Sequence, residues 1–233
     1  MAESVATFTP VPELPDGASW LTRFIYGFKA LIILKDEMGN PEAGALINRC
    51  FDHEVYAVVV ERMKKTEAGR RLLVERPSMS GEHLDLDALS ALPEGSLGHA
   101  FAKYYADQGF PPFNTTEPVD TEVQFVSKRY RETHDLMHVL TGYTTDNLGE
   151  MELQAFMRGT IGIRSALLIL VFGYGVNVWD RAVFLPTTYY RLLKRARVRG
   201  ERANLFLAFP FEEHWETPLD EVRRLVLKEE PTA

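Results

Sequence analysis

Apolar residues recur at helical spacing through nearly the whole chain, and this periodicity constrains the fold more than any other feature. Four segments place apolar residues at i, i+3, i+4 and i+7, at positions 21–32, 56–63, 97–105 and 189–196. No stretch alternates apolar and polar residues over five positions between turn signals, as a half-buried strand would. The proportions of 45% hydrophobic and 25% charged residues are those of a folded globular protein. The sequence therefore predicts an all-α fold, a single-domain helical bundle.

Helix boundaries follow from glycine, proline and capping residues. Gly142 and Gly200 are predicted to end helices. Thr121, three residues before a glutamine, predicts a helix that begins with a capping box. Asn147 and Glu150 have the same relation and predict a second helix start, from which an apolar helix is expected to continue to about residue 172.

The N-terminal sixteen residues differ from the rest of the chain. Residues 1–16 are rich in proline and acidic residues and predict a flexible arm, so that residues 17–233 form the helical domain. They lack the basic start and apolar run of a secretory signal peptide, which favours a cytoplasmic location. Residues 165–178 are uncharged, but fourteen residues are fewer than the roughly twenty that cross a bilayer. A buried or interfacial helix is expected there.

Charge and cysteine content exclude several classes of protein. Lysine and arginine number 26 against 33 acidic residues, which gives a net charge of −7. This balance argues against duplex nucleic acid as a partner, because phosphate binding favours a basic face. The single cysteine, Cys50, excludes an intrachain disulfide and is typical of a reducing compartment.

Two histidines stand four residues apart in the segment RYRETHDLMHVLTGYTTDNLGE. On a helix, the Cβ atoms of His134 and His138 lie roughly 5–6 Å apart on one face. Two imidazoles placed in this way can bind one metal ion at about 2.0–2.1 Å. Asp135 lies about 100° round the helix from His134, where it either binds the ion or orients an imidazole.

A further ligand has to come from another element, since one helix cannot surround an ion. Glu150 would lie about 18 Å from His138 on an unbroken helix. If the chain turns after Gly142, however, a second antiparallel helix brings Glu150 opposite the histidines. Two imidazoles and two carboxylates suit Zn²⁺, Fe²⁺ or Mn²⁺.

Each of these residues also has a structural explanation. Histidine pairs four apart occur by chance, and Glu150 serves equally as the capping partner of Asn147. Asp135 is equally compatible with an exposed acid. The residues alone leave a metal centre and a purely structural pair of helices both open.

The same segment carries the pattern H-D-x-x-H, eleven residues, then E, and it resembles the signature of the COQ-four family of ubiquinone (coenzyme Q) biosynthesis proteins. Residues 92–98 are similar to the family's Leu-Pro-Gly and Leu-Gly stretch, and residues 212–224 resemble its C-terminal Trp-Glu and Leu-Arg segment. The resemblance implies four metal ligands: His134, Asp135, His138 and Glu150.

The resemblance also implies an activity and a location. It implies a metal-dependent enzyme that removes the ring C1 carboxylate of a polyprenylated hydroxybenzoate, with hydroxylation replacing it. A role in organising other quinone-biosynthesis proteins is associated with the family as well. A prenyl lipid held between helices and peripheral attachment to the inner face of the cell membrane are implied too.

One departure from the family concerns the reaction. Where the family usually has Trp-Phe-Glu after the ligand glutamate, this chain has Ala155, Phe156 and Met157. If the missing carboxylate contacts the substrate ring, the chain acts on a different prenyl compound or only binds one.

Three residues are candidates for substrate binding. Tyr130 and Arg131 precede the histidines, and Arg164 falls about four turns from Glu150 on nearly the same stripe if the helix is unbroken. Residues 191–202 contain six basic residues, which suggests contact with anionic lipid or simply a solvated helix face.

Two other functions remain open on the sequence. A phosphohydrolase of the HD superfamily would draw further ligands from His83, His99 or Asp180, but gives His138 and Glu150 no role. A non-catalytic prenyl-lipid scaffold would use the metal only to brace two helices.

Overall fold

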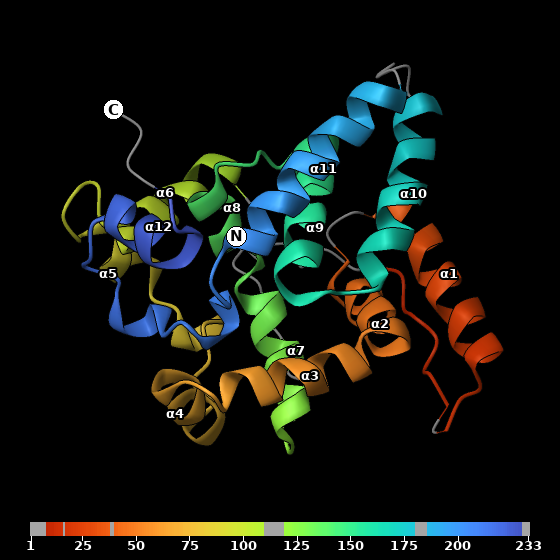
Figure 1. Ribbon diagram of the computed structural model, residues 1–233, viewed down its shortest axis with the longest axis horizontal. Helices are drawn as coiled ribbons and strands as arrows, with labels where there is room; N and C mark the ends of the chain where they lie inside the picture. Colours follow the sequence, from red (N-terminus) through yellow and green to blue (C-terminus); the bar gives the residue numbers. More distant parts are fainter. Residues whose placement is uncertain (1–7, 16, 38–39, 110–118, 180–185, 230–233) are drawn as a thin grey trace, which may run out of the picture. The chain divides into compact units, whose positions relative to one another are not determined.

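The computed structural model describes residues 8–15, 17–37, 40–109, 119–179 and 186–229, and these residues form helices joined by turns (Figure 1). The α-helices are α1 (Trp20–Asp36), α2 (Pro41–Phe51), α3 (His53–Met63), α4 (Glu67–Glu75), α5 (Leu86–Ser90), α6 (Leu97–Gln108), α7 (Glu122–Glu132), α8 (His134–Thr141), α9 (Asn147–Ile161), α10 (Ser165–Trp179), α11 (Pro186–Arg202) and α12 (Leu219–Leu227). Three short 3-10 helices are η1 (Gly81–His83), η2 (Phe206–Ala208) and η3 (Phe211–Glu213). Within the described residues there is no β-strand, so the predicted all-α class is confirmed.

The chain divides into two compact units, one up to Glu54 and one from Val55 onward. In the first unit, α1 and α2 pack against each other. Asn40 caps α2 by accepting hydrogen bonds from two backbone N–H groups of its first turn. Thr9 donates from its backbone N–H and its hydroxyl to the carboxylate of Glu37, which ties this part of the N-terminal segment to the end of α1. The division predicted at residue 16 remains a prediction.

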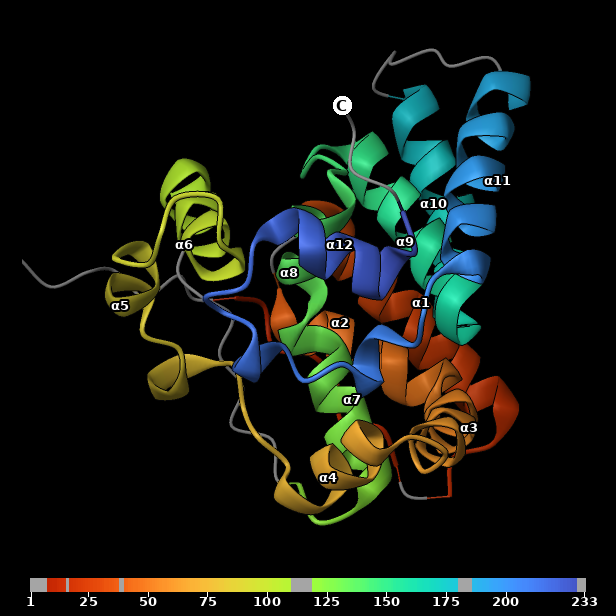
Figure 2. The same cartoon turned by 60° about the vertical axis from the view of Figure 1, so that its left-hand side comes forward.

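In the second unit, α9 and α11 run side by side over most of their lengths (Figures 1 and 2). A side chain at Gly159 would overlap the backbone oxygen of Arg197, and one at Gly200 would overlap that of Phe156. The prediction that Gly200 ends a helix is therefore wrong: α11 continues to Arg202. This glycine allows two helix backbones to approach closely.

Substitution of Gly200 by Ala is expected to destabilise the protein by about 1–3 kcal/mol, as overpacking does in a filled core. The added methyl group meets backbone atoms, which cannot rotate away. Gly44→Ala in α2 is the matched control, because no heavy atom lies within 4 Å of the position its methyl group would take. Urea denaturation followed by helical circular dichroism measures both. A Gly200→Ala variant as stable as the parent would contradict the close approach.

α9 ends at Gly162, which has a φ of +82° in the left-handed region that glycine adopts readily. Arg158 fastens the turn by donating to the carbonyl of Ile163 at 2.9 Å. The expected continuous helix from Asn147 to about residue 172 is therefore wrong. As a consequence, Arg164 lies in the turn between α9 and α10 and not on the helical stripe of Glu150.

The two flanking segments that resemble the family lie against each other. The backbone N–H of Leu97 donates to the carbonyl of Thr217 at 2.9 Å, and that of Gly98 donates to the carbonyl of Trp215 at 2.8 Å. The Trp215 ring stacks on Phe101, with centroids 5.8 Å apart. The start of α6 is thus joined to the segment that leads into α12.

Arg129 anchors α7, the helix that leads into the histidine helix α8. Its side chain is 0% exposed and pairs with Glu212 at 2.6 Å. It also donates to the carbonyls of Leu207 at 3.0 Å and Phe209 at 2.7 Å. A buried charge is tolerated only with such partners, so this network fixes α7 against the η2–η3 segment.

Among the described residues, no helix has both the length and the apolar character needed to cross a bilayer. α10, which contains the uncharged stretch noted in the sequence, has 15 residues.

Candidate metal centre

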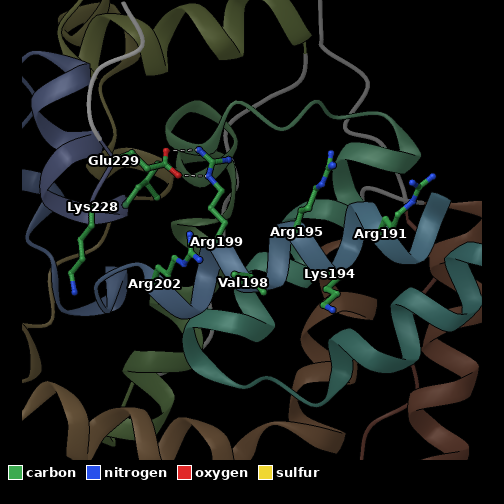
Figure 3. Close-up of a pocket in the computed structure, with 9 residues that line it drawn as sticks. Arg191, Lys194, Arg195, Val198, Arg199, Arg202, Lys228 and Glu229 are labelled. Carbon is green, nitrogen blue, oxygen red and sulfur yellow. Dashed lines mark hydrogen bonds and ion pairs between the residues drawn. The ribbon is translucent and has the colours of Figure 1, made fainter. Parts of the chain in front are cut away.

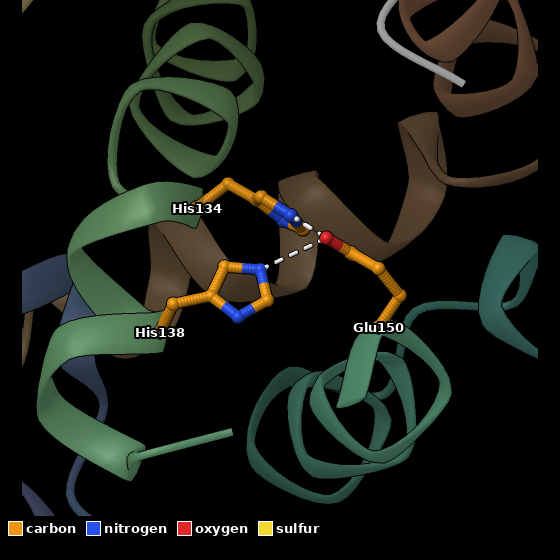
Figure 4. A group of neighbouring side chains, drawn as sticks. All are labelled: His134, His138 and Glu150. Atoms are coloured by element: carbon orange, nitrogen blue, oxygen red, sulfur yellow. Dashed lines mark ion pairs between the residues drawn. The ribbon is translucent and has the colours of Figure 1, made fainter. Parts of the chain in front are cut away.

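Three predicted ligands meet between α8 and α9 (Figure 4). Nε2 of His134 lies 3.3 Å from one carboxylate oxygen of Glu150, and Nε2 of His138 lies 3.1 Å from the other. The three ligand atoms all lie within 4.8 Å of one another. In Figure 4 the view is nearly along the axis of α9, and α8 is seen from the side. The two helices therefore cross and do not run antiparallel as expected.

The orientation of the His138 ring directs Nε2 toward Glu150, where it can bind a metal ion. Its Nδ1 lies 2.9 Å from the carbonyl oxygen of Tyr143, which can only accept, so Nδ1 carries a proton. In the neutral ring Nε2 then has a lone pair, and it faces the Glu150 carboxylate without a hydrogen bond of acceptable angle. Nε2 is also buried away from solvent. At 3.1 Å from the carboxylate, this nitrogen needs either a proton or a metal ion on its lone pair, and its place beside Glu150 and His134 fits a metal.

Charge at the cluster shifts two protonation equilibria. Burial alone would lower the pKa of His134, but the charge of Glu150, its hydrogen bond to the imidazole and the charge of Asp135 outweigh burial and raise that pKa to about 9. Burial would raise the pKa of Glu150, whereas the two histidines lower it to about 2. Without a metal, His134 is therefore protonated at neutral pH and Glu150 is ionised.

Asp135, the fourth predicted ligand, lies outside the group of three. Its Oδ2 accepts a hydrogen bond of 2.7 Å from the hydroxyl of Tyr105. Its charge still acts on the cluster, since it contributes to the raised pKa of His134. Tyr104 stacks on the His138 ring, with centroids 6.1 Å apart. The geometry thus places Asp135 beside the centre, and its role as a ligand remains a prediction.

The turn between the two helices brings Glu150 to the histidines. α8 ends at Gly142, as expected, and Asp146 caps α9 by accepting from the backbone N–H groups of Leu148 and Gly149 at 3.0 and 2.8 Å. The expected cap at Asn147 is therefore wrong by one residue. Because Asp146 provides the cap, the Glu150 side chain is available to the histidines.

Two arginines that nothing in the sequence connected with the histidines hold the C-terminal end of α8. Arg199 donates to the carbonyl of Thr141 at 2.7 Å and lies over the Tyr143 ring, 5.1 Å from its centroid. Arg223 donates to the carbonyls of Leu140 and Val139 at 3.0 and 3.1 Å. Cations satisfy the free carbonyls at a helix C-terminus, and here they fix the loop whose Tyr143 carbonyl sets the tautomer of His138.

The three candidate substrate residues lie in different surroundings. Tyr130 is buried, and its ring centroid is 5.9 Å from that of Tyr56 in the core. Arg131 is half-buried, with Nε 3.5 Å from the carbonyl of Ser127. Arg164 is exposed in the turn after α9. Their part in substrate binding remains a prediction.

Within the described residues, the other histidines proposed as ligands do not join this group. His83 is exposed in η1, and Nδ1 of His99 lies 3.0 Å from the carbonyl of Ser90. Asp180 lies outside the described residues. Among the described residues, the ligand set of an HD phosphohydrolase is therefore not assembled.

Fold and site together define an all-helical protein with a two-histidine, one-glutamate cluster that could hold a metal ion. A family model described as coenzyme Q (ubiquinone) biosynthesis protein Coq4 matches residues 36–231. The mitochondrial ubiquinone biosynthesis protein COQ4 homolog of Rattus norvegicus is 34% identical over 197 residues, or 78% of this chain and 73% of that relative. The homolog of Homo sapiens is 32% identical over 77% of this chain and 68% of its own length.

A solved structure is similar as well. The crystal structure of a protein from Nostoc punctiforme, which is assigned to ubiquinone biosynthesis, matches with a TM-score of 0.67 and 26% identity. The match covers 87% of this chain and 97% of that one. The chain belongs to the Coq4 family of coenzyme Q (ubiquinone) biosynthesis proteins, as its histidine-glutamate pattern indicated.

Proposed function

We propose that this protein is a metal-dependent enzyme of ubiquinone biosynthesis that binds one divalent ion, Zn²⁺, Fe²⁺ or Mn²⁺, through His134, His138 and Glu150. The observation that carries the proposal is the convergence of the three ligand atoms within 4.8 Å of one another, with the buried Nε2 of His138 3.1 Å from the Glu150 carboxylate. Two imidazoles and a carboxylate leave coordination positions for a substrate. Membership of the Coq4 family supports the assignment to ubiquinone biosynthesis.

The substrate that we propose is a polyprenylated hydroxybenzoate, which loses its ring C1 carboxylate. A bound divalent ion supplies positive charge that stabilises negative charge developing on the ring. Glu150 and the two histidines fix the position of this charge, and Asp135 is expected to join them or to orient His134. Tyr105 holds Asp135 in place through its hydroxyl.

A second candidate function, a non-catalytic prenyl-lipid scaffold of the quinone-synthesis proteins, is favoured by one observation. Met157 takes the place of the glutamate that the family usually has, and it is 0% exposed in the core. Ala155, on the same helix, is also buried. No carboxylate is therefore available at position 157 to contact a substrate.

For location, we propose peripheral attachment to the inner face of the cell membrane, with contact to other quinone-biosynthesis proteins. The reason is chemical: a polyprenyl substrate is nearly insoluble in water and resides in a bilayer. The curated relatives named above are described as mitochondrial.

Elemental analysis combined with mass spectrometry of the purified protein is the direct test. We expect about one divalent ion per chain, together with a co-purified polyprenyl aromatic lipid. A protein whose metal content is unchanged by replacing His138 with Ala would contradict the metal centre. A metal-loaded protein that carries no prenyl compound, even after incubation with a polyprenyl hydroxybenzoate, would contradict the substrate.

A further inference from the structure

A groove of about 480 Å³ lies between α11 and the C-terminal end of α12, and six of the nine residues that line it are cationic (Figure 3). The cationic residues that line it are Arg191, Lys194, Arg195, Arg199, Arg202 and Lys228. Glu229 is the one acid among the lining residues. Since the whole chain has a net charge of −7, this concentration of positive charge is local. None of the three metal-centre ligands lines the groove, although Arg199 also contacts the loop beside them.

The arginines are spaced so that they gather on one face of α11. Arg191, Arg195 and Arg199 are four residues apart, and in Figure 3 their side chains project to the same side of the helix. Like charges at this spacing destabilise a helix. Among the described residues, five of the six cations have no ion-pair partner: Arg191, Lys194, Arg195, Arg202 and Lys228. An anion in the groove would relieve the repulsion between them.

The contact between Arg199 and Glu229 shows which kind of anion the groove accepts. One carboxylate oxygen accepts from Nε of Arg199 at 2.6 Å, and the other accepts from Nη2 at 2.8 Å. This two-point geometry is also the one in which a guanidinium binds a phosphate. Glu229 binds Arg199 and none of the other cations, so those cations are available to a ligand.

We propose that this groove is a binding site for a ligand that carries two or more phosphate groups. The cations on α11 extend over twelve residues, from Arg191 to Arg202, or about 16 Å along the helix, which is longer than one phosphate can contact. Val198 and Leu227 add an apolar part to the lining, so an organic group attached to the phosphates has a surface to contact. The site does not depend on the metal centre.

Calorimetric titration with inorganic diphosphate at about 0.15 M salt, where exposed charges more than about 8 Å apart are largely screened, tests the proposal. Vesicles of phosphatidylcholine with and without cardiolipin, whose headgroup carries two phosphates, form a second arm, which distinguishes a free phosphate from a lipid headgroup. The variant is Arg195→Ala with Arg202→Ala. Its control, Arg197→Ala with Arg224→Ala, removes the same charge from exposed residues that do not line the groove.

We expect diphosphate to bind the parent and the control pair within twofold of each other, and the groove variant to bind at least about tenfold more weakly. Binding only to vesicles that contain cardiolipin, again lost in the groove variant, also supports the site and assigns it to a headgroup. His138→Ala is expected to leave binding unchanged, so failure of the metal centre would not affect this result.

Three results would overturn the proposal. The first is that neither probe binds the folded protein. In the second, the control pair weakens binding as much as the groove pair, which would indicate a general effect of charge. In the third, His138→Ala removes binding, which would place the anion at the metal centre.

Discussion

Replacement of Glu150 by Gln is expected to lower the affinity for the metal by at least about 100-fold. Loss of a residue that only hydrogen-bonds to a metal ligand lowers the affinity about 10- to 100-fold, and Glu150 is proposed as a ligand itself. The substitution removes the negative charge and one of the two oxygens that face the histidines at 3.3 and 3.1 Å. The amide has nearly the same shape, and its NH₂ group can donate to Nε2 of His138. We therefore expect the variant to fold, with loss of the metal and not of the helices.

Glu152→Gln is the matched control for this variant. Glu152 lies two residues further along α9 and is half-buried, but it is not part of the cluster. Metal per chain by elemental analysis, and ubiquinone made in cells that lack their own family member, are the two measurements. Loss of ubiquinone in a folded Glu150→Gln variant that still binds lipid indicates catalysis. Full ubiquinone synthesis after loss of the metal would exclude the enzyme and leave the scaffold.

The cluster itself could be predicted because its parts are local. The spacing of His134 and His138 fixes two ligands on one helix face, and Gly142 ends that helix close enough for Glu150 to return. Angles between helices are not local, so the crossing of α8 and α9 was missed. Asp135 illustrates the same limit, since its partner Tyr105 lies 30 residues away in α6.

The supporting residues could not be predicted from spacing at all. Arg199 and Arg223 reach carbonyls of α8 from 58 and 83 residues away, and nothing next to them in the sequence marks that contact. Gly200 could be read only as a helix end, because glycine ends helices more often than it lies where two helices touch. The break at Gly162 was missed because the apolar residues on both sides kept a helical period.

Metal affinity is expected to increase about ninefold between pH 7 and 8 and about fivefold between pH 8 and 9, or about 50-fold in total, because a proton and the metal compete for His134. The charges of Glu150 and Asp135 hold the pKa of this imidazole at about 9, despite its burial. Below that pH each metal ion has to displace one proton. The pKa of Glu150 is about 2, so this carboxylate stays ionised and adds no further slope.

Competition with a coloured chelator at pH 7, 8 and 9, corrected for the chelator's own protonation, measures this slope. Calorimetry in buffers of different ionisation enthalpy counts the released protons, and about one per metal is expected at pH 7. His134→Gln should bind more weakly and lose the slope. An affinity that is flat over this range in the parent would mean that His134 is not a ligand.

The same shifts predict how the metal-free protein responds to pH. The pKa of His134 is raised in the folded state, so its contribution to the free energy of unfolding is complete below the ordinary value of 6.5 and is lost as the pH rises through about 9. The pKa of Glu150 is lowered, so its contribution is complete above 4.5 and is lost as the pH falls through about 2. The pair therefore stabilises the metal-free protein most between about pH 4.5 and 6.5.

Urea denaturation midpoints of the metal-free protein are expected to decline from pH 6.5 to 9, and those of the metal-loaded protein are not. Equal declines in both forms would place the titrating group elsewhere.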